Sequence, residues 1–129
     1  MTMGAPAGRF CWVDLAATDA SRAIEFYAGL FGWSAHATAA NGGTFVRLAG
    51  DGDDVGSLYQ MQTQARDAGV PSHWTPYVRV EDAQAACEKA VALGGTVAVA
   101  PFEVDAIARI ALVVDPGGAS FGLWEDLHR

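Results

Sequence analysis

Strand-length segments rich in apolar and aromatic residues recur along this chain, and breaks rich in Gly, Asp and Pro separate them. Polar side chains interrupt most of these segments at intervals that fit strands, in which successive side chains point to opposite faces. The pattern predicts strands at 10–16, 33–39, 44–48, 55–61, 75–80, 96–100, 109–114 and 119–125. Turns are expected at 41–43, 50–54 and 115–118, a polar connector at 62–72 and a loop at 101–108.

Two segments have the spacing of amphipathic helices instead. The first is predicted to begin at Thr18 or Asp19 and to run to about Leu30, and Asp19 is suited to cap it. Its apolar stripe consists of Ala23, Ile24, Tyr27 and Leu30. The second helix is predicted to begin after Asp82 and to run to Leu93. Glycine follows closely on each segment, which is typical of helix ends.

The two halves of the chain repeat each other at an offset of 63 residues. Asp19 then falls on Asp82 and Leu30 on Leu93, and the order strand, helix, strand, strand, strand occurs twice. We therefore predict an α+β fold in which two tandem βαβββ modules form a curved mixed sheet around a cavity, with the helices outside. The modules are expected at about 9–61 and 74–126 of a single domain over 9–129, after a disordered tail over 1–8.

Composition and charge argue against several classes of function. The 129 residues suit one compact domain, and the longest apolar run has strand length, well short of the roughly 20 residues that span a bilayer. The net charge is −7 and Lys89 is the single lysine, so no basic stripe is available for nucleic acid or for an anionic membrane surface. No signal peptide is evident, and a cytoplasmic location with reduced Cys11 and Cys87 is expected.

Several motifs resemble those of the vicinal-oxygen-chelate superfamily, which includes glyoxalases, bleomycin resistance proteins and dioxygenases. They are Trp12-Val13-Asp14-Leu15, Thr18-Asp19, Phe26-Tyr27-Ala28-Gly29-Leu30-Phe31-Gly32-Trp33, Leu93-Gly94-Gly95 and Asp115-Pro116-Gly117-Gly118. The resemblance covers about residues 9–126 and is strongest to a glyoxalase-like branch. It implies the duplicated βαβββ fold.

The resemblance also implies where a metal ion would bind, because the family's metalloenzymes carry His, Glu or Gln ligands on the first and last strands of both halves. The matching positions are Trp12, Thr75, Gly122 and, on the remaining strand, Tyr59 or, after a one-residue slip, Leu58 or Gln60. An indole and a glycine offer no ligand atom in their side chains, and a threonine hydroxyl is a poor ligand for a divalent ion. The sequence therefore predicts no metal and no other cofactor.

Alternation along the strands directs these same positions toward the predicted cavity. The expected ligand-binding residues are Trp12, Asp14, Tyr59, Thr75, Tyr77, Gly122 and Trp124. Aromatic walls with a few polar groups suit a planar or apolar small molecule, and Gly122 would leave room for it. Alternatively, the aromatic side chains fill the interior; Asp14 would then need a charged partner, and Arg79 and Arg47 are candidates.

The leading hypothesis is a metal-free small-molecule binding protein of the resistance or sequestration kind, acting as a homodimer. The alternative is a lyase or isomerase of the glyoxalase or dioxygenase type acting on a small oxygenated substrate. In a metal-free version of that chemistry, Asp14 would be the general base, and Tyr77 or Tyr59 would donate to a developing oxyanion. A third hypothesis is an interaction protein whose core is filled by its own side chains.

Overall fold

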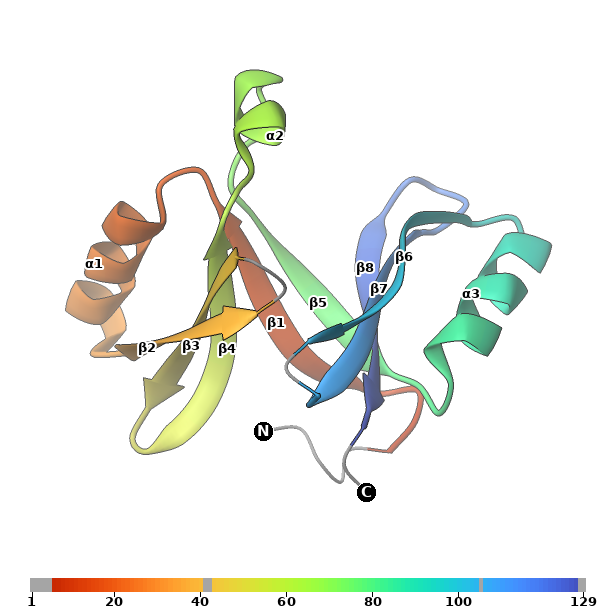
Figure 1. Cartoon of the computed structure of the whole chain (residues 1–129), viewed down its shortest axis with the longest axis horizontal. Coiled ribbons are helices and arrows are strands. Elements are labelled where there is room, and N and C mark those ends of the chain that lie inside the picture. Colours follow the sequence, from red (N-terminus) through yellow and green to blue (C-terminus); the bar gives the residue numbers. More distant parts are fainter. Residues whose placement is uncertain (1–5, 41–42, 105, 128–129) are drawn as a thin grey trace. The chain divides into compact units, whose positions relative to one another are not determined.

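The computed structural model describes residues 6–40, 43–104 and 106–127. The order strand, helix, strand, strand, strand occurs twice along the chain, with a short helix between the two halves (Figure 1). The elements are β1 (Phe10–Ala17), α1 (Ala20–Phe31), β2 (Ser34–Ala40), β3 (Gly43–Gly50), β4 (Asp53–Gln60), α2 (Thr63–Asp67), β5 (His73–Arg79), α3 (Ala83–Ala92), β6 (Thr96–Val104), β7 (Ala108–Val114) and β8 (Ser120–Asp126). The predicted α+β class and the tandem βαβββ modules are confirmed.

The contacts divide the chain into two compact units. Among the described residues, the first unit consists of those within 13–74, and the second joins residues 6–12 to those within 75–127. The boundary therefore falls inside β1, whose first residues belong to the second unit.

The sheet of the first unit has the strand order β2-β3-β4-β1. Its β1 and β4 are parallel, and the other neighbours are antiparallel. Helix α1 packs on one face of this sheet, where Ile24 and Tyr27 contact the buried core. That core consists of Leu15, Ala17, Val46, Leu48 and Leu58. The odd residues of β1 and the even residues of β3 and β4 thus point toward the helix, as strand alternation requires.

The second unit repeats this plan with the strand order β5-β8-β7-β6, in which β5 and β8 are parallel. On one face, Cys87 of α3 packs with Ala111, Val113 and Leu123. The second cluster of this unit consists of Trp12, Tyr77, Ala108 and Trp124.

Each long helix begins with the same pair of hydrogen bonds. The carboxylate of Asp19 accepts from the backbone N–H of Arg22, and that of Asp82 accepts from the N–H of Ala85, which confirms both predicted caps. In addition, the residue at the end of the parallel strand accepts a bond from the first N–H of the helix. Gln60 Oε1 lies 2.9 Å from the Ala20 nitrogen, and Glu125 Oε1 lies 2.9 Å from the Ala83 nitrogen.

Two segments differ from the predictions. The polar connector at 62–72 contains α2, a single turn without an apolar stripe, so the sequence held no periodic signal for it. Strand β6 continues to Val104 through the predicted loop at 101–108. Pro101 is compatible with this because β6 is an edge strand, where an absent N–H interrupts no ladder, and the register shifts nearby.

The ends and one turn lie partly outside the described residues. Of the predicted tail, residues 1–5 are outside, whereas Gly8 donates its N–H to the carbonyl of Arg79 at 2.7 Å. Of the predicted turn at 41–43, residues 41 and 42 are outside. None of the helices in the described part of the chain is long and apolar enough to cross a membrane.

Candidate ligand-binding site

Asp14 lies on the face of the first unit's sheet that points away from α1. Its neighbour Leu15 belongs to the helix-side core, so alternation directs Asp14 to the opposite face. The parallel register places Ser57 of β4 directly beside it, and Ser57 Oγ donates a hydrogen bond of 2.8 Å to Asp14 Oδ1. Asp14 is 8% exposed and Ser57 is 0% exposed, so this is a buried polar pair in a strand interior.

Burial raises the pKa of Asp14 to about 6. The hydrogen bond from Ser57 and the charge of His73 favour the carboxylate, but they offset only part of the desolvation. Near pH 7 the carboxylate predominates by about tenfold, and a mildly acidic medium protonates it. Asp14 therefore changes charge within a range in which most carboxyl groups stay ionised.

Tyr59 lies two residues beyond Ser57 on β4 and shares its face of the sheet. Its side chain is half-buried, and burial together with the negative charge of Asp14 raises the pKa of its phenol. The hydroxyl consequently keeps its proton at neutral pH and can donate a hydrogen bond. The first unit thus brings together two of the predicted site residues, Asp14 and Tyr59, around Ser57.

The second unit brings together most of the others. Trp12 and Trp124 have ring centroids 5.7 Å apart, and Tyr77 meets Trp124 edge to face at 6.1 Å. All three side chains are buried. Thr75 is half-buried and lies two residues before Tyr77 on the same side of β5.

Gly122 does not leave room for a ligand, contrary to the prediction. The register pairs it with Tyr77, whose ring crosses the glycine so closely that an added Cβ would lie 2.2 Å from Tyr77 Cδ2. Residue 122 must be glycine because the ring of Tyr77 occupies the space that a side chain would need. This position is therefore one of aromatic packing within the second unit.

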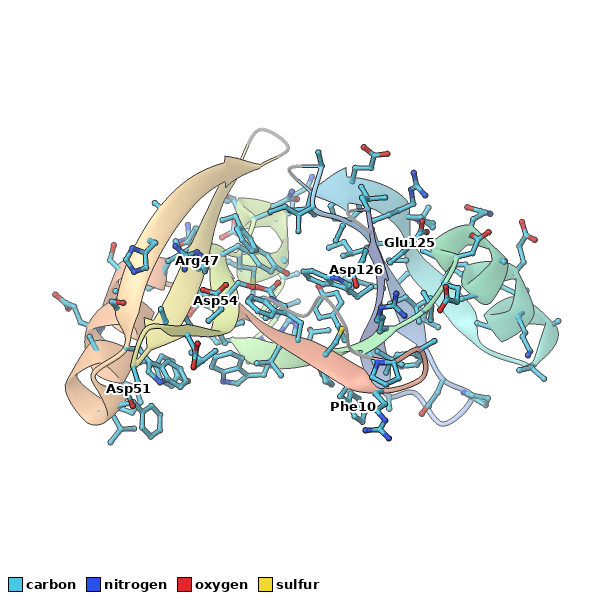
Figure 2. The ribbon with its side chains drawn as sticks, turned by 90° about the horizontal axis from the view of Figure 1, so that it is seen from below. Phe10, Arg47, Asp51, Asp54, Glu125 and Asp126 are labelled. Atoms are coloured by element: carbon cyan, nitrogen blue, oxygen red, sulfur yellow. The ribbon has the colours of Figure 1, made fainter. Side chains whose placement is uncertain are left out.

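Sequence reasoning missed the group that holds Trp124. The indole Nε1 donates to Asp126 Oδ1 at 2.7 Å, and Arg79 Nε donates to Asp126 Oδ2 at 3.0 Å. Asp126 is 4% exposed and follows Glu125 at the end of β8, where both are labelled in Figure 2. A carboxylate two residues after a strand tryptophan is the only sequence signal for this contact, and it is a weak one.

The arginines suggested as partners of Asp14 bind other carboxylates. Arg79 pairs with Asp126 and Glu81. Arg47 of β3 pairs with Asp54 of β4, and these two residues lie close together in Figure 2. Asp14 is held by a hydroxyl instead of a cation.

The register also settles which β4 residue corresponds to Gly122. Asp14 pairs with Ser57 as Tyr77 pairs with Gly122. The offset between the modules is 63 residues at Asp14 and Tyr77 but 65 residues at Ser57 and Gly122. The equivalent position is therefore Ser57, and not Tyr59, Leu58 or Gln60.

Gln60 has a structural role in this arrangement. Its amide nitrogen donates to the carbonyl of Thr18 at 2.8 Å while its oxygen accepts from Ala20. Both halves of the amide are used at the start of α1, so Gln60, the one residue of the three candidates with a suitable ligand atom, is already bound to the backbone.

The fold and the sequence motifs described above point to the same protein family. Residues 9–123 match the model of the Glyoxalase/Bleomycin resistance protein/Dioxygenase superfamily. This chain belongs to that superfamily, as its motifs predicted.

Curated relatives carry two kinds of name. A protein of Mycobacterium tuberculosis named putative glyoxylase CFP32 is 35% identical over 88% of this chain and 44% of its own length. The anthracycline biosynthesis protein DnrV of Streptomyces peucetius is 33% identical over 96% of this chain and 49% of its own length. This chain therefore spans about half the length of the curated relatives it matches.

Solved structures confirm the fold. Methylmalonyl-CoA epimerase from Mycobacterium tuberculosis superimposes with a TM-score of 0.66 at 21% identity, covering 98% of this chain and 93% of that one. The hypothetical protein BH1468 from Bacillus halodurans gives a TM-score of 0.69 at 13% identity, covering 94% of this chain and 96% of that one. At these identities the likeness concerns the fold alone.

The residues at the family's ligand positions do not fit a metal ion. With the register fixed, these positions are Trp12, Ser57, Thr75 and Gly122, which offer two neutral hydroxyl groups and neither imidazole nor carboxylate. Within residues 6–40, 43–104 and 106–127, no three His, Cys, Asp or Glu side chains are grouped so that they could hold a metal.

Gly122→Ala is expected to destabilise the protein by about 1–3 kcal/mol, because the new methyl group forces the Tyr77 ring out of its place. Urea unfolding followed by far-UV circular dichroism measures the change. Gly29→Ala is the matched control, since a Cβ there meets nothing within 4 Å and alanine favours the helix. Equal stability of Gly122→Ala and the wild type would contradict this packing.

Asp14→Asn is expected to become more stable relative to the wild type as the pH rises. The folded-state pKa of Asp14, about 6, exceeds the ordinary value of 3.8, so the proton favours folding. This stabilisation is complete below about pH 4 and is lost as the pH rises through about 6, by up to about 3 kcal/mol.

Urea unfolding of both proteins between pH 4 and pH 8 measures this difference. Asp67→Asn, at an exposed carboxyl of α2, is the control for the change of net charge. A difference between Asp14→Asn and the wild type that stays constant over this range would show that the pKa of Asp14 is not raised.

Proposed function

We propose that this chain binds a small, planar or apolar organic molecule without a bound metal ion, in a resistance or sequestration role. The observation that carries this proposal is the buried pair of Asp14 and Ser57. A carboxyl group in a strand interior with only a hydroxyl beside it destabilises the fold, and such a group is typical of a site whose purpose is to contact something else.

The aromatic residues of the second unit support the same proposal. Trp12, Tyr77 and Trp124 form a packed group, and Asp126 with Arg79 fixes the indole of Trp124. Rigid aromatic surfaces bind planar ligands with little loss of side-chain entropy. We infer that Trp12, Thr75, Tyr77 and Trp124 supply apolar contact within the second unit, and that Asp14 and Tyr59 supply polar contact within the first unit.

Metal-independent proton transfer on a small oxygenated substrate is the second candidate. A general base works best when its pKa is near the working pH, and the pKa of Asp14, about 6, meets this condition. Epimerases among the solved structures share this fold. In this version Asp14 removes a proton, and the hydroxyl of Tyr59, which belongs to the same unit, donates to the oxyanion that forms.

Metal content is the first measurement. Elemental mass spectrometry on untagged protein purified without chelators should find divalent metal at far less than one ion per chain, because the ligand positions lack imidazole and carboxylate groups. A stoichiometric divalent metal would overturn the metal-free proposal. The control is a metal-binding member of the same family prepared in parallel.

A thermal-shift screen of planar aromatic compounds then tests binding. We expect hits whose stabilisation grows with ligand concentration. A hit that is also consumed would favour the second candidate, and Asp14→Asn should then abolish turnover. Absence of stabilisation throughout the screen would count against a small-molecule function.

We also propose that the chain forms a homodimer through the exposed apolar face of α1. Phe26, Leu30 and Phe31 are 60%, 58% and 58% exposed, and no charged residue occurs between Phe26 and Trp33. Exposed patches of this kind are typical of protein–protein contacts. With a net charge of −7, two copies repel each other least where both surfaces are uncharged.

The double variant Phe26→Ser, Phe31→Ser is expected to be monomeric where the wild type is dimeric, because it removes two aromatic anchors from the patch. Sedimentation velocity at matched concentrations measures this. Val91→Ser on α3, at a site 56% exposed, is the control and should remain dimeric. A wild type that is monomeric at all concentrations tested would overturn the proposal.

A further inference from the structure

The carboxylate of Asp14 has an unused acceptor. Its Oδ1 accepts from Ser57, and its Oδ2 receives no hydrogen bond from any group in the described part of the chain. An ionised carboxylate has room for about four hydrogen bonds, and a buried one with a single donor is strongly under-satisfied. With 8% of Asp14 exposed, bulk water reaches little of it.

The basic groups of the first unit leave this charge without a bound cation. Arg47 projects from β3 on the same face of the sheet as Ser57, but its guanidinium binds Asp54. His73 lies at the start of β5 and acts on Asp14 only through its charge, while its Nδ1 contacts the carbonyl of Pro71 at 2.9 Å. The remaining facing groups, Ser57 and Tyr59 of β4, are neutral at pH 7.

We propose that Asp14 receives a protonated amine of the ligand, so that the site selects cationic molecules over neutral or anionic molecules of the same shape. This inference rests on the small-molecule function proposed above and names the class of its ligand. An ammonium group supplies the hydrogen-bond donors that the carboxylate lacks, and it carries the opposite charge. A neutral hydroxyl supplies only a donor, and an anionic group is repelled.

The surroundings strengthen this preference. The chain has a net charge of −7, which raises the local concentration of cations and lowers that of anions. The half-buried ring of Tyr59 is near enough for the charge of Asp14 to affect its pKa, and an aromatic ring beside an ammonium group adds a cation–π contact.

The affinity of the site for an amine should fall as the pH is lowered. As the pH falls through about 6, Asp14 gains a proton and loses the charge that attracts the amine. Binding of the amine should therefore weaken in mild acid, whereas binding of a neutral ligand of the same shape should change little.

Three probes that share the naphthalene ring and carry substituents of similar size test the proposal: 2-(aminomethyl)naphthalene, 2-naphthalenemethanol and 2-naphthoate. Isothermal titration calorimetry at pH 7.5 should give an affinity for the amine at least about tenfold above that for the alcohol, and weaker binding still for the carboxylate. At pH 5.0 the advantage of the amine over the alcohol should shrink severalfold. The full chain is used throughout.

Variants assign the effect to Asp14. Asp14→Asn keeps the shape of the side chain and should bring the amine and the alcohol to similar affinities, whereas Asp67→Asn removes the same charge from exposed α2 and should leave the preference intact. Ser57→Ala removes the hydrogen bond that lowers the pKa of Asp14, so the pH midpoint of amine binding should move upward. A purely structural role of Ser57 would not move that midpoint.

The outcomes separate the two proposals. If none of the probes binds, the small-molecule function fails and the preference for amines fails with it. If the alcohol binds as tightly as the amine, or the preference for the amine survives in Asp14→Asn, the function stands and the preference is overturned.

Discussion

The parallel pairing of the first and last strands of each module is the constraint on which the rest of this structure depends. A parallel pair cannot be closed by a tight turn, so the chain must cross over, and here it crosses through a helix and two further strands. The end of the last strand then lies beside the start of the helix. Gln60 and Glu125 use this proximity to accept the first helical N–H, which joins sheet and helix in both modules.

The same pairing explains how much of the fold the sequence could predict. Local signals along the chain predict the modules directly. They are the helix caps Asp19 and Asp82, the glycines that follow both helices, and the periodicity of the strands. Register across strands is not local. The two-residue difference between the helix offset and the last-strand offset arises in the segments between them, so extending the offset of the helices to β4 led to Tyr59 instead of Ser57.

The candidate site shows the same limit at the level of side chains. Alternation correctly grouped Trp12, Tyr77 and Trp124, because parity along a strand can be read from sequence. It could not show that the Tyr77 ring lies over Gly122, since a glycine that makes space for a ligand and one that makes space for a neighbouring ring look alike in sequence. The sequence also could not show that Arg79 pairs with Asp126 instead of Asp14. In an acidic chain, several carboxylates compete for each arginine.

What distinguishes the two modules is how each satisfies the buried carboxylates of its parallel strands. In the second unit, Asp126 and Glu125 are both buried, and both are matched by donors: Trp124 and Arg79 for one, Ala83 and Arg109 for the other. In the first unit, Asp14 is equally buried but receives one hydroxyl, while the nearby Arg47 is committed to Asp54. Among the residues that the structure describes, the other buried carboxylates are matched by donors, whereas the under-satisfied Asp14 lowers stability at its own position. Such a local loss is expected where a ligand supplies the missing partner.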